Sequence, residues 1–112
     1  MSVSAIETTL AESAAPATTR PSHPELVAAA AALRAHITDL LPVAEKQVDG
    51  LWRGGPEWCG RRTRLDIAQR HASDVMPALP LSAHVYVSLL RRDCEWLLEH
   101  YGQALLAAGA AR

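Results

Sequence analysis

The chain has 112 residues and a formal net charge of -1 at neutral pH, which is enough sequence for one domain with a single modest core. A net charge this close to zero gives no bulk attraction to nucleic acid or to a membrane surface, so we expect neither as a partner. The two cysteines lie far apart, as free thiols of an intracellular protein do. The N-terminus lacks the pattern of a signal peptide, and no apolar run approaches the roughly 20 residues of a membrane span, so we expect a cytoplasmic protein.

Residues 1–21 are rich in Ser, Thr, Ala and Pro. This composition buries too little apolar surface to offset the entropy lost on ordering, so the stretch is predicted to be a flexible, disordered N-terminal tail. The spacing of Val3, Ile6 and Leu10 leaves one alternative open, which is a short helix at residues 3–14 that docks on the domain.

The first long helix is predicted over residues 23–49. Ser22 and Glu25 have the spacing of a capping box, and Pro24 suits the first turn. Pro42 lies inside the pattern and removes one backbone hydrogen bond, but the apolar phase is kept on both sides of it. We therefore predict one kinked helix instead of two. Its apolar face consists of Leu26, Ala30, Leu33, Ile37, Leu40, Ala44, Val48 and Leu51.

Residues 50–60, GLWRGGPEWCG, are predicted to be a turn-rich connection. It carries Trp52, Arg53 and Trp58, and two interpretations of these residues remain open. We favour the one in which the tryptophan rings cap the open end of the helices, because large aromatic side chains stabilise most when they are buried. The alternative is a binding lip in which Arg53 lies between the two rings and all three residues contact a ligand.

The second helix is predicted over residues 61–76, with Leu65, Ala68, Ala72, Val75 and Met76 as its core face. Arginine and aspartate alternate every four residues on one side, which is typical of a solvated salt ladder. Pro77 and Pro80 bracket a short corner in which Leu79 and Leu81 are predicted to turn inward.

The third helix is predicted over residues 82–106, with Ser82 as its N-cap. Its broad apolar face consists of Ala83, Tyr86, Val87, Leu90, Cys94, Leu97, Leu98 and Tyr101. A second apolar strip lies beside this face and is formed by Val85, Leu89 and Trp96. We predict that this strip contacts a partner helix or a second copy of the chain, with Arg92, Asp93 and His100 as its polar rim. The alternative is that the strip is a seam within the monomer and that Asp93 pairs with Arg61 or Arg64.

Together these patterns predict an all-α protein, a small antiparallel bundle of three main helices at residues 22–108 that follows the disordered tail. The residues give little support for catalysis. The Cys and His residues are scattered without metal-ligand spacing, so no metal site and no cofactor are expected. Cys94 and His100 lie on different sides of one helix, and Cys94 is predicted to be a small core residue. No catalytic residue is assigned, and we lean against an enzyme.

Two segments resemble a known family. Residues 62–101, RTRLDIAQRHASDVMPALPLSAHVYVSLLRRDCEWLLEHY, and residues 33–46, LRAHITDLLPVAEK, resemble small uncharacterised actinobacterial helical proteins. Those proteins share an internal Pro in the first helix, a Pro-containing corner and a last helix that closes on His-Tyr. The centre of the second helix, Ala68-Gln69-Arg70, departs from the Ala-Arg-like centre of that family. Such proteins are sometimes labelled natural-product biosynthesis proteins, so the resemblance implies an accessory role and carries over no catalytic residue.

Three functions follow as hypotheses. The first is an accessory protein-interaction module, linked to natural-product biosynthesis. The second is a small DNA-binding transcriptional regulator, because residues 53–70 are rich in arginine, although Glu95 and Glu99 on the last helix would repel phosphate. The third is a small-ligand binder or enzyme, which would need a pocket lined by Trp52, Trp58 or Trp96.

Overall fold

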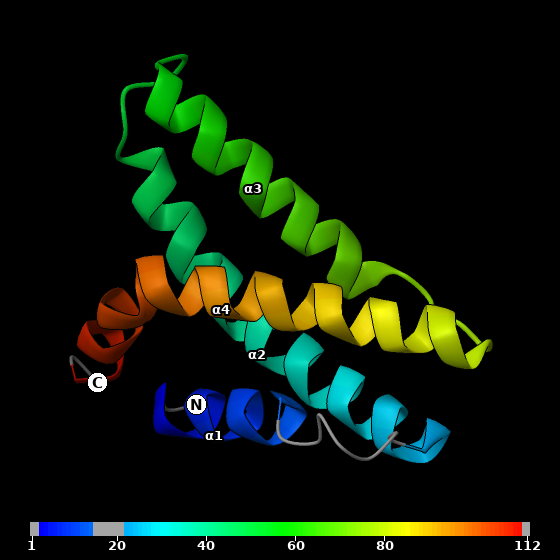
Figure 1. The fold of residues 1–112 in the computed structure, drawn as a ribbon. Helices are drawn as coiled ribbons and strands as arrows, with labels where there is room; N and C mark the ends of the chain where they lie inside the picture. The colour runs from blue at the N-terminus through cyan, green and yellow to red at the C-terminus, as the bar shows by residue number, and fades with distance from the viewer. Residues whose placement is uncertain (1–2, 15–21, 111–112) are drawn as a thin grey trace.

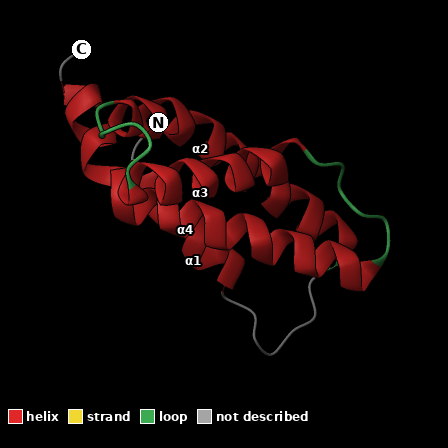
Figure 2. Ribbon diagram, turned by 90° about the horizontal axis from the view of Figure 1, so that it is seen from above, coloured by secondary structure: helices red, strands yellow, loops and turns green. Residues whose placement is uncertain are grey.

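The computed structural model describes residues 3–14 and 22–110, and these ranges form four helices with no strand among them. The helices are α1 (Val3–Ala14), α2 (His23–Asp49), α3 (Pro56–Ser73) and α4 (Pro80–Ala110). In Figure 1, α2 and α4 cross at the centre, α1 lies along one side of them, and α3 lies on the other. The α2–α3 and α3–α4 connections lie at opposite ends of the molecule (Figures 1 and 2). The all-α class is confirmed, but the predicted number of main helices is too small.

The additional helix is α1, which corrects the prediction of a disordered tail. The side chain of Ile6 is fully buried, and Leu10 is partly buried against the core. The Oγ1 atom of Thr9 lies 2.8 Å from Nε2 of His36 on α2. Composition alone pointed to a tail, but two apolar side chains at helical spacing are enough to dock a helix when a surface to receive them exists. The remaining tail residues, 15–21, lie outside the described part of the chain.

The predicted bounds of α2 are confirmed. The Ser22 side chain accepts a hydrogen bond from the backbone N–H of Glu25 at 3.3 Å, and Gly50 ends the helix. Pro42 lies within the continuous helix, as predicted. By length and composition α2 is apolar enough to cross a membrane, but such evidence is weak because core helices pass the same test. Its apolar face packs on α1, α3 and α4, as the face of a core helix does.

The predicted bounds of α3 are wrong at both ends. The helix begins at Pro56 because proline suits the first helical position, where its missing N–H costs nothing. Gly54 before it adopts a φ of +86°, a conformation that glycine adopts without strain. At the other end the chain becomes extended at Asp74, so the predicted core residue Val75 is 90% exposed. Leu65 and Ala68 are buried as predicted.

The last helix, α4, also begins earlier than predicted, at Pro80 instead of Ser82. The backbone N–H of Ala83 bonds to the carbonyl of Leu79 at 2.8 Å, so Ser82 is inside the helix and is not its N-cap. The corner residues Leu79 and Leu81 are 70% and 75% exposed, which corrects the prediction that they turn inward. The predicted core face is confirmed at its buried members, which are Ala83, Tyr86, Val87, Leu90, Cys94, Leu97 and Tyr101, whereas Leu98 is partly buried.

Candidate functional site

The predicted apolar strip of the last helix lies at the surface of α4 and is only partly covered. Val85 is 50% exposed, Leu89 and Trp96 are partly buried, and Arg92 is exposed. The exposed Leu81 lies four residues before Val85, so it extends the same face by one turn. We call the set Leu81, Val85, Leu89, Arg92 and Trp96 the α4 strip.

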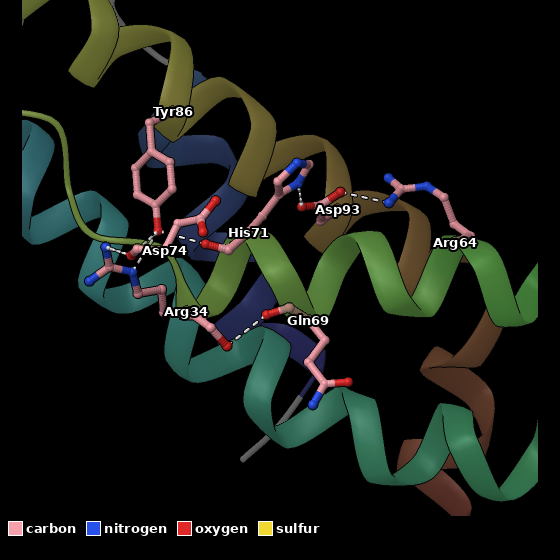
Figure 3. Close-up of polar contacts among 8 residues, drawn as sticks. Arg34, Arg64, Gln69, His71, Asp74, Tyr86 and Asp93 are labelled. Atoms are coloured by element: carbon pink, nitrogen blue, oxygen red, sulfur yellow. Dashed lines mark hydrogen bonds and ion pairs between the residues drawn. The ribbon is translucent and has the colours of Figure 1, made fainter.

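Asp93 does not belong to the rim of this strip, which corrects the first interpretation. Its side chain is 3% exposed, and its two carboxylate oxygens lie 2.6 Å from Nη1 of Arg64 and 2.6 Å from Nδ1 of His71 (Figure 3). The alternative, in which Asp93 pairs with Arg64 across the helices, therefore describes the structure. A buried carboxylate needs such partners because its desolvation is otherwise uncompensated. Asp93 of α4 thus contacts α3 at two positions about two helical turns apart.

The contact surface between α3 and α4, which we call the α3–α4 seam, continues towards the end of α4 as a cluster of aromatic side chains. The rings of Trp96 and His100 stack with their centroids 4.5 Å apart, and Tyr101 meets Trp96 edge-on at 5.7 Å. The guanidinium of Arg64 lies 5.3 Å from the Trp96 ring, so it contacts both this ring and Asp93. The ring of the exposed His100 covers part of Trp96, and its Nδ1 lies 2.9 Å from the carbonyl of Trp96, to which it can donate.

Arg61 joins the cluster from α3. It donates to the hydroxyl of Tyr101 at 3.1 Å and pairs with Glu57 at 3.4 Å. The hydrogen bond to Tyr101 is the largest of the effects that raise the pKa of Arg61. The residues predicted as a partner-binding rim therefore divide into two groups. Arg92 and His100 remain at the surface, and Asp93 belongs to the interior of the α3–α4 seam.

Sequence reasoning missed a second polar centre at the end of α3. The hydroxyl of Tyr86 lies 2.7 Å from the carbonyl of His71 and 3.1 Å from that of Asp74, and it accepts a hydrogen bond from Nε of Arg34 at 2.9 Å. Arg34 also donates to the Asp74 carbonyl at 3.0 Å (Figure 3). A cation and a hydroxyl at the C-terminal carbonyls stabilise the helix end. The available signal was the tyrosine on an apolar face, since a buried hydroxyl needs a partner.

The predicted lip residues differ in how far they are buried. Trp52 is 85% exposed, so it does not cap the helices, and Arg53 beside it is also exposed. Trp58 belongs to the first turn of α3 instead of the loop, and it packs partly buried against the core. Because α3 begins at Pro56, Trp58 lies on a helix instead of in the predicted connection.

A comparison with protein-family models matches residues 4–105 to a family of unknown function, DUF6415. The chain belongs to this family. The match begins within α1 and ends within α4, so α1 is part of the region that the family model describes. Neither the curated proteins nor the solved structures contain a match to the chain.

The surroundings of Cys94 and His71 determine what chemistry these two side chains can do. Desolvation in the core, assisted by Glu95 and Asp93, raises the pKa of the Cys94 thiol to about 12, so the reactive thiolate is scarce at neutral pH. His71 and Asp93 form an oriented pair, but the described residues provide no hydroxyl or thiol bonded to the other ring nitrogen of His71. The described residues also include no group of three or more side chains that could hold a metal ion.

Proposed function

We propose that the protein is a cytoplasmic, accessory protein-interaction module that docks a second copy of itself through the α4 strip. The observation that carries this proposal is the run Leu81, Val85 and Leu89, which recurs every four residues on one helix face and leads to Trp96. The exposed fractions of Leu81 and Val85 are 75% and 50%. Contiguous exposed aliphatic side chains with a tryptophan at one end are typical of an interface.

A second copy suits this surface because apolar side chains of the strip lie on both sides of Leu89. An antiparallel pairing of two α4 helices about Leu89 brings Leu81 of one copy towards Trp96 of the other. The aliphatic stem of Arg92 can then cover apolar surface while its guanidinium stays in water. Two-fold symmetric dimers are also the commonest assemblies of identical chains.

The accessory role in natural-product biosynthesis rests on the resemblance of residues 62–101 to small actinobacterial proteins that carry such a label. The arginines of α3 weigh against the alternative of a DNA-binding regulator. Arg61 pairs with Glu57, Arg62 pairs with Asp66 and Glu45, and Arg64 pairs with Asp93. A phosphate backbone would have to compete with each of these carboxylates.

The self-association is tested by Val85→Glu, which puts a charge in the proposed interface at a position that is already half exposed. Sedimentation velocity should show a dimer for the wild-type chain and a monomer of unchanged helical circular dichroism for the variant. Leu89→Glu should give the same result. Val27→Glu is the matched control, because Val27 is 42% exposed and lies on α2. The proposal is wrong if the wild-type chain is monomeric at about 100 μM, or if Val27→Glu dissociates it equally.

A further inference from the structure

A groove of about 350 Å³ lies between α1 and the C-terminal half of α4. Its apolar lining comes from both helices, with Val3 and Leu10 on α1 and Leu98 and Leu106 on α4. Gly102 contributes no side chain, and Leu98 folds over it so closely that an added Cβ would lie 3.2 Å from the Leu98 Cδ1 atom. The two walls of the groove are therefore two neighbouring helices, and both supply apolar side chains.

The rim of the groove is acidic. Glu7 of α1 and Glu95 and Glu99 of α4 line it, and no Lys, Arg or His of the described residues does. Glu95 pairs with Arg91 at 2.9 Å, whereas Glu7 and Glu99 form no ion pair within the part of the chain that the structure describes. Docking of α1 thus gathers carboxylates of like charge around one apolar surface. A cation between them would relieve their repulsion.

We propose that this groove binds an amphipathic helix of a partner protein whose polar face is basic. A helix fits because apolar residues at helical spacing on two helices receive the apolar face of a third. The carboxylates of Glu7 and Glu99 match Lys or Arg beside that face. A groove this open would leave most of a small molecule uncovered, and its charge repels phosphates and anionic lipids. The site is distinct from the α4 strip, since none of the strip residues lines the groove.

The probe is a synthetic peptide of about 18 residues, with Leu at helical spacing on one face and Lys on the flanks. Its binding to the full chain is measured by fluorescence anisotropy. A second peptide with Glu in place of every Lys is the matched control. The basic peptide should bind, and should bind at least fivefold more weakly when salt is raised from about 0.05 M to about 0.5 M. The acidic peptide should not bind.

The double variant Glu7→Gln/Glu99→Gln locates the interaction, because it removes two charges and keeps the side-chain shape. It should weaken binding of the basic peptide about fivefold or more. Asp49→Asn, which removes an exposed charge at the end of α2, should leave binding unchanged. Amide shifts on peptide binding should centre on Gly102 and Gln103.

Four results would overturn the proposal. These are no binding of the basic peptide, equal binding of the acidic peptide, equal loss in Asp49→Asn, and amide shifts that centre on residues 81–92. The Val85→Glu chain should bind the peptide as the wild type does. A failure of the α4 strip as a dimer interface is therefore distinguishable from a failure of the groove.

Discussion

At the scale of single residues, Asp93 is the carboxylate whose ion pairs are the most buried. It is buried and bonded to Arg64 and His71, so replacing it by Asn removes a charge that both partners were placed to meet. Asp93→Asn should lower the free energy of unfolding by about 2–4 kcal/mol, as loss of one member of a buried ion pair does. Asp66→Asn breaks an exposed pair with Arg62 and should cost less than about 1 kcal/mol. Urea melts compare the two variants, and equal small losses would show that Asp93 is solvated.

His36 gives a second prediction at this scale. The Thr9 Oγ1 atom lies 3.0 Å from the Ala5 carbonyl and 2.8 Å from Nε2 of His36, and when the hydroxyl donates to the carbonyl, Nε2 donates to the hydroxyl. Burial lowers the pKa of His36 below its ordinary value of 6.5, and Asp39 opposes this only in part. The unfolded chain therefore takes up the proton more readily than the folded chain does. The stability that comes from keeping His36 neutral is fully present above pH 6.5, and it is lost as the pH falls from 6.5 towards the folded pKa.

The change that tests this is His36→Gln, whose amide can donate to Thr9 but does not titrate. Urea melts at about pH 7.5 and about pH 5.5 should show a smaller acid-induced loss of stability in the variant than in the wild type. Thr9→Val is the control, because it removes the hydrogen bond and leaves the imidazole. An identical pH dependence in His36→Gln and the wild type would contradict a role for His36.

At the scale of elements, replacing Pro42 tests how far the stability of α2 is limited by the backbone hydrogen bond that this proline removes. The residue is exposed inside a continuous helix, so Pro42→Ala restores a backbone hydrogen bond and removes no packing. The helix gain exceeds the extra entropy of the unfolded chain, and the free energy of unfolding should rise by about 1–2 kcal/mol. Urea denaturation followed by circular dichroism measures this. A loss of stability would mean that the packing of α2 requires the proline.

The elements also show what the sequence can and cannot predict. The bounds of α2 were predictable because Ser22, Glu25 and Gly50 act locally at its ends. The starts of α3 and α4 are not predictable from Pro56 and Pro80 alone, because proline is common in turns and equally begins a helix. Only the tertiary surface decides that α1 docks, since the composition of residues 1–21 favours a tail.

At the scale of the whole molecule, α4 packs on the other three helices, and its seams with α2 and α3 differ in character. The seam with α2 includes the hydrogen bond from Arg34 to Tyr86. The buried side chains of α4, such as Leu90 and Leu97, were predictable from helical periodicity. Towards α3 the seam consists of ion pairs and aromatic contacts around Asp93 and Trp96. Periodicity could place Asp93 on a helix edge but could not tell whether α3 or water meets it. The pairing of Asp93 with Arg64 and His71 therefore follows only from the way the helices pack.

The two cysteines give the protein a built-in pair of chemical probes. Cys59 is exposed in the first turns of α3, whereas Cys94 is fully buried and its thiolate is suppressed. A thiol-specific dye therefore labels the native chain at Cys59 alone. Modification of Cys94 must wait until α4 separates from its neighbours, so its rate records how often the core opens. Without any substitution, the chain thus offers Cys59 for attaching a fluorescent label and Cys94 for measuring the rate at which the core opens.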